Sequence, residues 1–86
     1  MEVVKTGQFK RDIKLAIKRH KDTAKLKKVL DLLYNCETLP EIYRDHKLHG
    51  TNYRECHIEP DWLLIYRIEG DTLHLIRAGS HADLFG

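Results

Sequence analysis

Apolar residues recur at helical spacing in the first 34 residues of the chain and at strand spacing in the last third. The first five residues have the character of a short strand, and Thr6 is suited to cap a helix that follows it. The buried face of this helix is predicted to hold Phe9, Ile13, Ala16, Ile17 and His20. Its opposite face is basic and carries Lys10, Arg11, Lys14, Lys18 and Lys21.

A second helix is predicted to begin near Asp22. Its apolar residues follow the i, i+3, i+4, i+7, i+8 pattern of one buried stripe, formed by Leu26, Val29, Leu30, Leu33 and Tyr34. The two helices together form a hairpin with a basic exterior. From residue 35 to 52 the periodicity fails, Pro40 ends the helix, and Gly50 and Asn52 are typical of turns. This region is therefore expected to be a long ordered loop, with His46 within it.

Three strands are predicted after this loop, over residues 53–58, 62–68 and 72–78. The short Gly- and Pro-containing connections favour antiparallel hairpins. We therefore expect an α+β fold in one domain, residues 1–86: a small antiparallel sheet of about four strands with the N-terminal helical hairpin packed on one face. The other face stays partly open. Alternation along the first of these strands puts Glu55 and His57 together, away from the apolar side.

The net charge of +2 hides an uneven distribution of charge along the chain. Residues 1–28 hold ten Lys or Arg against three Asp or Glu, a net of +7, and the remaining residues hold five against ten, a net of −5. A basic block of this kind attracts phosphate backbones without reading their sequence. Lysine-rich helix faces are also common as plain solvated surface, so charge alone leaves both interpretations open.

Neither the cysteines nor the apolar runs indicate export or membrane insertion. Cys36 and Cys56 lie far apart without a paired-cysteine motif, which favours free or buried thiols in a reducing compartment. The longest apolar run, Trp62 to Tyr66, is too short to span a bilayer, and charges occupy the N-terminal region where a signal peptide needs apolar residues. A cytoplasmic protein that does not enter membranes is therefore expected.

Candidate chemistry is concentrated in the C-terminal half, in His46, His57, Asp61, Arg77 and His81. RNA carries its own nucleophile, the 2′-hydroxyl, and its cleavage needs a base, an acid and positive charge for the transition state. Imidazole suits both proton transfers near neutral pH, and a guanidinium can bind two phosphate oxygens. Asp61 follows His57 across a proline turn and can fix its tautomer. Taken singly, each of these residues can also be an ordinary surface residue.

Two aromatic residues have two possible roles each. Trp62 opens a strand and can either pack in the core or offer a stacking surface to a base, with core packing favoured. Phe85 lies one residue from the last position, and the pair Leu84-Phe85 indicates that the tail folds back against something apolar.

Two segments together resemble the YafQ-like branch of the RelE superfamily. The first is Asp45-His46-x-Leu48-x-Gly50 followed by YRECHIEPDWLLIY at residues 53–66, and the second is Arg77-x-Gly79-Ser80-His81-x-x-Leu84-Phe85. Members of this branch are bacterial type II toxins that cleave messenger RNA on the ribosome and are silenced by a co-expressed antitoxin. The resemblance extends from the basic helical hairpin to the last residue.

The resemblance implies a role for each candidate residue. The catalytic set is His46, His57, Asp61 and His81, and the supporting residues are Trp62, Arg77 and Phe85. The general base would be His46 or His57, with Asp61 orienting it, and His81 would be the general acid. No metal or other cofactor is implied. The implied partners are a cognate antitoxin, messenger RNA and ribosomal RNA, the last docked by Lys10, Arg11, Lys14, Lys18 and Lys21.

Two other classes of function remain as alternatives. One is a metal-dependent hydrolase in which His57, Asp61 and another histidine bind zinc or iron, although no H-E-x-x-H or paired-cysteine spacing is present. The other is a non-catalytic module that binds a nucleic acid or a protein partner, for which the histidines are incidental.

Overall fold

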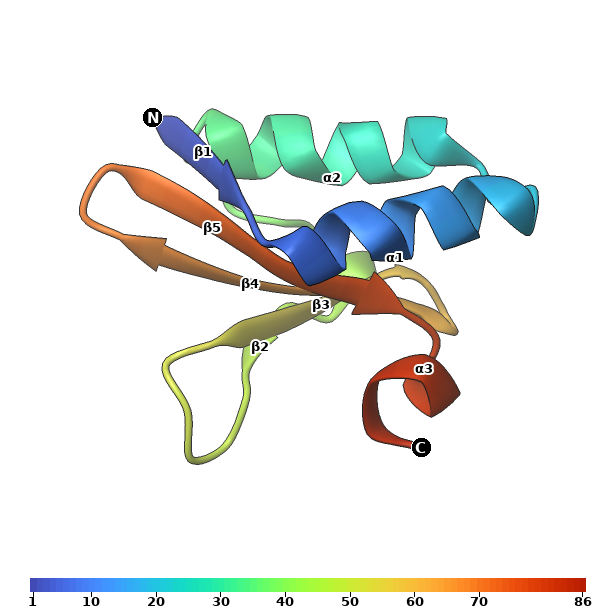
Figure 1. The fold of residues 1–86 in the computed structure, drawn as a ribbon. Helices are drawn as coiled ribbons and strands as arrows, with labels where there is room; N and C mark the ends of the chain where they lie inside the picture. Colours follow the sequence, from blue (N-terminus) through green and yellow to red (C-terminus); the bar gives the residue numbers. More distant parts are fainter.

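Five strands form one sheet with the order β1-β5-β4-β3-β2 in the computed structural model, which describes residues 1–86 (Figure 1). The strands are β1 (Glu2–Lys5), β2 (His46–Lys47), β3 (Arg54–Glu59), β4 (Trp62–Glu69) and β5 (Thr72–Gly79). The helices are α1 (Gly7–Lys18), α2 (Thr23–Tyr34) and α3 (His81–Phe85), with a single 3-10 turn, η1 (Glu41–Tyr43). None of the helices has the length and apolar character needed to cross a membrane.

The predicted α+β fold is confirmed, with two corrections to the sheet. It has five strands rather than about four, and β1 runs parallel to β5, with Glu2 opposite Thr72 and Lys5 opposite Leu75. The meander β3-β4-β5 is antiparallel as expected. The strand in the first five residues was predicted, but its parallel pairing with β5 was not. Strand β2 was not predicted, and it covers the edge of β3 that the meander would otherwise leave unpaired. The region predicted as one loop, residues 35–52, accordingly contains η1 and β2.

Both predicted helix starts are confirmed by their capping hydrogen bonds. The Thr6 hydroxyl accepts from the Phe9 N–H at 2.9 Å, and the Asp22 carboxylate accepts from the Ala24 N–H at 3.0 Å. The buried faces are narrower than predicted, since Ile17 is 57% exposed and Tyr34 is 50% exposed. Each lies in the last turn of its helix. His20 lies after α1 with a positive φ of 59° and is also exposed.

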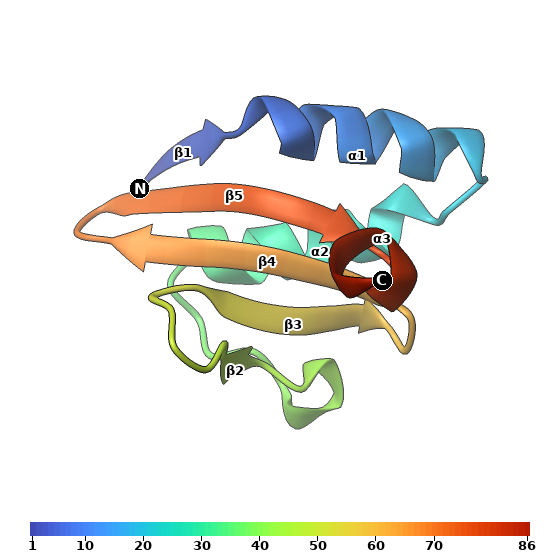
Figure 2. The same cartoon turned by 60° about the horizontal axis from the view of Figure 1, so that its bottom comes forward.

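Helices α1 and α2 cover one face of the sheet, and α3 lies on the other face at the end of β5 (Figures 1 and 2). Fourteen buried residues form the core between the helices and the sheet, among them Val29 of α2 and Leu64 of β4. Leu63 and Ile65 are also buried but do not belong to this core. Alternation along β4 directs them to the face that carries α3.

The strand register fixes which side chains share this second face, which we call the open face. His57 of β3 lies opposite Leu63, which lies opposite Gly79. One step along, Glu55 lies opposite Ile65, which lies opposite Arg77, and His46 of β2 lies opposite Glu55. Directly opposed residues of neighbouring strands point to the same face. The open face therefore gathers polar residues from β2, β3 and β5 over the apolar residues of β4.

Helix α1 completes the edge of β5 where β1 ends. β1 reaches only as far as Leu75, and beyond it the Thr6 hydroxyl donates to the Ile76 carbonyl at 2.7 Å. The Asp12 carboxylate then accepts from the Ala78 N–H and from two nitrogens of the Arg77 guanidinium, each at 3.0 Å. Burial alone would raise the pKa of Asp12, but the hydrogen bonds from Arg77, Gln8 and Ala78 outweigh it and lower the pKa.

Replacement of Asp12 by Ala is expected to lower the free energy of unfolding by about 2 kcal/mol, because it leaves a strand N–H and a guanidinium without their acceptor. Urea unfolding measures this loss. Asp31→Ala is the matched control, since Asp31 forms only an exposed pair with Lys27 on α2 and should cost less than about 0.5 kcal/mol. Equal urea concentrations at the unfolding midpoint for the two variants would contradict the assigned role of Asp12.

Candidate functional site

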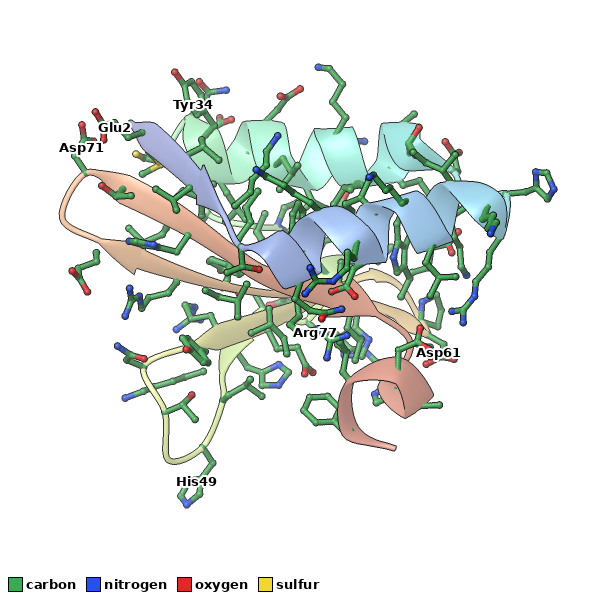
Figure 3. All side chains as sticks on the ribbon, in the orientation of Figure 1. Glu2, Tyr34, His49, Asp61, Asp71 and Arg77 are labelled. Atoms are coloured by element: carbon green, nitrogen blue, oxygen red, sulfur yellow. The ribbon has the colours of Figure 1, made fainter.

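Four rings lie in a row across the open face. The ring centroids of His46 and His57 are 6.5 Å apart, those of His57 and His81 are 5.8 Å apart, and those of His81 and Phe85 are 6.5 Å apart. The row crosses from β2 over β3 to α3, so residues distant in the sequence form one surface. His49, in contrast, lies at the tip of the β2–β3 loop and points away from the rest of the molecule (Figure 3).

The elements that hold the histidines differ in part from those predicted. His46 lies in strand β2 rather than in the loop predicted for residues 35–52, and His81, expected in the loop after the last strand, is the first residue of helix α3. Ser80 caps α3 by accepting from the Asp83 N–H at 3.1 Å. Regular structure at both positions gives the two imidazoles a fixed backbone from which to reach the open face.

All three imidazoles have an oxygen acceptor at Nδ1. The acceptor of His46 is the Arg44 carbonyl at 2.7 Å, that of His57 is the Pro60 carbonyl at 3.1 Å, and that of His81 is the Asp61 carboxylate at 2.8 Å. A carbonyl or carboxylate oxygen can only accept, so Nδ1 carries the proton in each neutral ring. The Nε2 atoms of the three rings are therefore left as the nitrogens that can take up a proton.

Asp61 orients His81, and the expected contact between Asp61 and His57 is absent. The Asp61 carboxylate accepts from the backbone N–H of His81 at 2.9 Å as well as from its ring. These bonds lower the pKa of Asp61, with the bond from the backbone N–H having the largest effect. Figure 3 shows Asp61 beside the start of α3. The turn directs the carboxylate toward the end of β5, while the ring of His57 bonds to the Pro60 carbonyl of the same turn.

Glu55 is a site residue that the sequence analysis did not select. Its carboxylate lies 3.5 Å from Nε2 of His46 and 3.9 Å from Nε2 of His57, and its side chain is only 7% exposed. Its negative charge therefore lies beside the two ring nitrogens that are left for proton transfer. The signal was present in the sequence, because strand alternation puts Glu55 on the same face as His57.

A second carboxylate fixes the segment that carries His46. Asp45 accepts from the hydroxyl of Tyr66 in β4 and from Nη2 of Arg54 in β3 at 2.9 Å. Burial, followed by the hydrogen bond to Asp45, raises the pKa of Tyr66, so this hydroxyl remains a donor. The network attaches the start of the short strand β2 to its neighbour β3 and to β4 beyond it.

The three residues predicted to support catalysis have different surroundings. Arg77 binds Asp12 through Nε and Nη2, so Nη1 is the guanidinium nitrogen without a protein partner. Trp62 is 2% exposed and packs in the core, with Nζ of Lys21 above its ring at 5.9 Å from the centroid. The tail folds back as helix α3 against β5, with Leu84 half-buried, but Phe85 itself is 59% exposed, and its ring centroid lies 6.5 Å from that of His81.

The basic residues predicted to dock on RNA divide into two groups. Lys10, Arg11, Lys14 and Lys18 of α1 are exposed and form no ion pair. Lys21 is half-buried, and its ammonium lies 3.3 Å from the Glu59 carboxylate. The exposed positive charge of this helix face therefore comes from four residues rather than five.

The geometry can support proton transfer to and from a substrate that lies on the open face. No group of three or more His, Cys, Asp or Glu side chains is arranged to hold a metal ion. Cys56 is fully buried, and burial raises the pKa of its thiol to about 12. It is therefore not available as a nucleophile near neutral pH.

Comparison with a family model and comparison with known sequences identify the same protein family. A family model described as the bacterial toxin YafQ of type II toxin–antitoxin systems matches residues 1–86. The mRNA interferase toxin YafQ of Escherichia coli K12 is 50% identical over 84 residues, which cover 94% of this chain and 91% of that protein.

Solved structures of similar proteins share the fold. A chain of the crystal structure of the E. coli DinJ–YafQ toxin–antitoxin complex is 48% identical, with a TM-score of 0.93 and coverage of 99% of this chain and 97% of that chain. A crystal structure of a metal-bound toxin from Helicobacter pylori is 37% identical, with a TM-score of 0.92 and coverage of 99% of both chains.

The attachment of helix α3 to the rest of the molecule is expected to weaken at low pH, because the carboxylate of Asp83 links α3 to the end of α1. Its carboxylate accepts from Arg19 Nη1 at 2.7 Å and from the Ser80 N–H at 3.0 Å, and these bonds lower the pKa of Asp83 to about 2. An unfolded Asp titrates at about 3.9, so this stabilisation is complete above that pH and is lost as pH falls toward 2. Asp61, whose pKa is also lowered, acts in the same direction.

Cα chemical shifts of residues 81–85, followed from pH 7 to pH 2, should thus lose their helical character below about pH 4. Asp83→Asn should show weakened helical shifts already at pH 7. Asp71→Asn, in the exposed β4–β5 turn, is the control and should behave as the wild type. Full helical shifts in Asp83→Asn at pH 7 would show that the link to Arg19 does not hold α3.

Proposed function

The chain belongs to the YafQ family of bacterial toxins from type II toxin–antitoxin systems and is an mRNA interferase, and we propose that it cleaves messenger RNA on the ribosome by histidine acid–base catalysis without a metal. The observation that carries this proposal is the row of three imidazoles on the open face. Each has Nδ1 bonded to an oxygen acceptor and Nε2 left for proton transfer.

The general base is assigned to the pair His46 and His57. Either Nε2 can remove the proton of the 2′-hydroxyl, which then attacks the adjacent phosphorus. Glu55 lies within 4 Å of both nitrogens, so it stabilises whichever imidazolium forms. Because the two rings share one carboxylate, the assignment of the base is made to the pair and not to one ring.

The general acid is assigned to His81. In its protonated form Nε2 donates to the departing 5′-oxygen, while Nδ1–H stays bonded to Asp61. Asp61 acts as a positioning residue, since it fixes both the ring and the first backbone N–H of α3. The centroid separation of 5.8 Å between His57 and His81 suits an acid and a base on either side of one phosphodiester.

The supporting residues are assigned by what they present to the substrate. Nη1 of Arg77 can contact a non-bridging phosphate oxygen while Nε and Nη2 remain on Asp12. Phe85 offers an exposed ring on which the base after the cut can stack. Trp62 contributes from the core, where it supports the turn that carries Asp61.

Partners are assigned from the family and from charge. A cognate antitoxin is a partner of this toxin, as DinJ is of E. coli YafQ in the complex described above. Helix α1, which carries the exposed basic residues, lies on the opposite side of the sheet from α3, which carries His81 (Figures 1 and 2). It is therefore free to bind ribosomal RNA while messenger RNA occupies the open face. Positioning by the ribosome implies weak cleavage of free RNA.

A metal-dependent hydrolase is the second candidate, favoured by the metal-bound H. pylori toxin. A single His–carboxylate pair can bind a transition metal weakly, and Asp61 with His81 is such a pair. We prefer proton transfer because all three Nδ1 atoms already have an acceptor and both carboxylates are positioned to stabilise imidazolium ions.

His81→Ala and His57→Ala should each lower the single-turnover rate of cleavage on ribosomes by about 10²–10⁴-fold while ribosome affinity stays near that of the wild type. For the wild type, the rate should follow a bell-shaped dependence on pH, because base and acid must be in opposite protonation states. His49→Ala is the control and should cleave normally, since His49 points away from the site.

Normal cleavage by His81→Ala, or a flat profile of the cleavage rate from pH 5 to 9, would exclude this mechanism. If these variants also lost ribosome binding, the histidines would belong to a binding module instead.

Charge reversal of Lys10, Lys14 and Lys18 to Glu is expected to weaken ribosome binding by at least about 100-fold and to reduce its salt dependence. Filter binding at several salt concentrations measures both. The matched control is reversal of Lys27 on α2, whose partner Asp31 already neutralises it. Unchanged affinity of the triple variant would remove α1 from the docking surface.

A further inference from the structure

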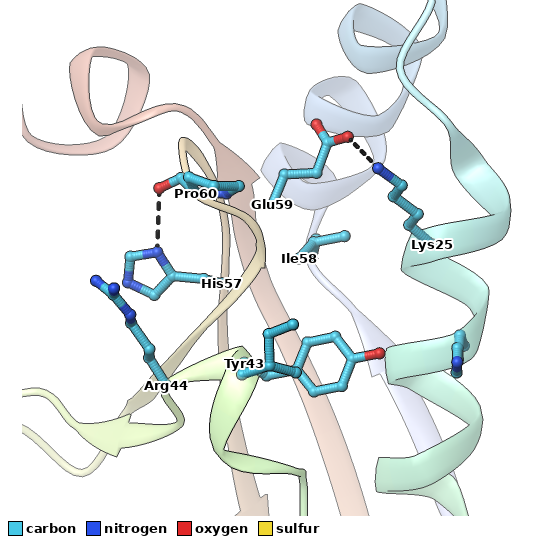
Figure 4. Close-up of a pocket in the computed structure, with 9 residues that line it drawn as sticks. Lys25, Tyr43, Arg44, His57, Ile58, Glu59 and Pro60 are labelled. Carbon is cyan, nitrogen blue, oxygen red and sulfur yellow. Dashed lines mark hydrogen bonds and ion pairs between the residues drawn. The ribbon is translucent and has the colours of Figure 1, made fainter.

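A hollow of about 730 Å³ opens next to His57, between η1, α2 and the β3–β4 turn (Figure 4). Its volume lies in the range of small-molecule and nucleotide sites. We call it the side groove, and it is lined by Lys25, Lys28, Ile42, Tyr43, Arg44, His57, Ile58, Glu59 and Pro60. Because His57 belongs both to its wall and to the row of rings, the groove continues directly from the proposed active site.

The side groove has an unbalanced positive charge. Its one carboxylate, Glu59, lies 2.9 Å from Nζ of Lys25 and 3.3 Å from Nζ of Lys21, which lower its pKa. Lys28 and Arg44 form no ion pair or side-chain hydrogen bond with the protein. The groove thus presents one ammonium and one guanidinium to solvent without a partner of opposite charge, as a phosphate site requires.

Arg44 is held next to the reacting groups by its backbone. Its φ is +49°, in the left-handed region that an Arg side chain seldom occupies. In this conformation its carbonyl bonds His46 Nδ1 at 2.7 Å. Figure 4 shows its guanidinium beside the ring of His57, on the side away from Pro60. One residue therefore orients one imidazole and directs a cation toward the neighbouring one.

We propose that the side groove binds the nucleotide upstream of the cut, with Arg44 and Lys28 on its 5′-phosphate; this inference rests on the proposed function. The polarity follows from the order of the rings. The 2′-hydroxyl belongs to the upstream nucleotide and must meet the base, His46 or His57, at the groove end of the row. The departing 5′-oxygen belongs to the downstream nucleotide and must meet His81, beside Phe85 at the other end.

The apolar wall of the groove suits a base attached to this phosphate. Ile42 is 80% exposed, and the ring of Tyr43 lies half-buried beside it. Single-stranded RNA is bound in this way, with splayed bases on apolar or aromatic side chains and phosphates on cations. An extended segment of the antitoxin is the competing occupant, but the unpaired cations and the direct connection to His57 favour RNA.

The test combines a side-chain change with a change of the messenger. A methylphosphonate replaces the 5′-phosphate of the upstream nucleotide in a ribosome-bound messenger, which removes its negative charge. In single-turnover cleavage, Arg44→Gln on the normal messenger and the wild type on the modified messenger should each be slower by about tenfold. The modified messenger should slow Arg44→Gln by a clearly smaller factor than it slows the wild type, because this variant has already lost one of the two cations that contact the phosphate.

Three controls make the result specific. Lys27→Ala, on α2 outside the groove, should cleave as the wild type does. A methylphosphonate one nucleotide downstream of the cut should slow the wild type and Arg44→Gln by the same factor. Arg44→Lys should recover part of the rate, and thermal unfolding should show that all variants are folded.

The outcomes separate the two proposals. Two results would overturn the side groove while leaving the proposed function intact. One is a wild-type rate for both Arg44→Gln and Lys28→Ala. The other is that the modified messenger slows Arg44→Gln by the same factor as it slows the wild type. Normal cleavage with weakened antitoxin binding in these variants would assign the groove to the antitoxin and also overturn it. If the wild type left ribosome-bound messenger uncut, the proposed function and this inference would fail together.

Discussion

The contact between Asp61 and His81 connects the β3–β4 turn to helix α3, and it thereby links the proposed general acid to the sheet that carries the proposed general base. One carboxylate in the β3–β4 turn accepts both the first backbone N–H of α3 and the imidazole Nδ1–H of the same residue. It thereby places a ring from the C-terminal helix 5.8 Å from the ring of His57 on the sheet. Without this contact, α3 would be attached through the ion pair of Asp83 with Arg19 and through its packing on β5. The imidazole of His81 would then have no fixed position relative to that of His57.

The sheet has two faces with different functions. One face packs on α1 and α2 and supplies the core, while the other gathers His46, Glu55, His57 and Arg77 through the register of β2 to β5 and receives His81 from α3. Leu63 and Ile65 form a buried apolar floor beneath these polar groups, which keeps water from part of the site. Asp12 connects the two faces, since it completes the free edge of β5 from α1 and holds Arg77 on the open face. Stability and positioning of the guanidinium thus depend on the same carboxylate.

Local features of this structure could be predicted from the sequence, and features that depend on long-range contacts could not. The caps at Thr6 and Asp22 act over two or three residues, so composition and spacing were sufficient. The parallel pairing of β1 with β5 joins residues about 70 positions apart, and nothing local marks it. The partner of Asp61 was predicted wrongly because His57 is near in the sequence while His81 is near in space. Glu55 could have been found by alternation, but its closeness to two imidazoles depends on β2, which was expected to be a loop.

The nature of the RNA ends tests the central claim most directly. If imidazoles move protons to and from the RNA's own 2′-hydroxyl, cleavage on ribosomes must leave a 2′,3′-cyclic phosphate on one fragment and a 5′-hydroxyl on the other, as mass spectrometry of the fragments can show. A messenger with 2′-deoxyribose at the cut must then resist cleavage. Fragments with a 3′-hydroxyl and a 5′-phosphate, with the deoxy messenger still cut, would instead indicate attack by an activated water, as metal-dependent hydrolases perform, and would contradict this account.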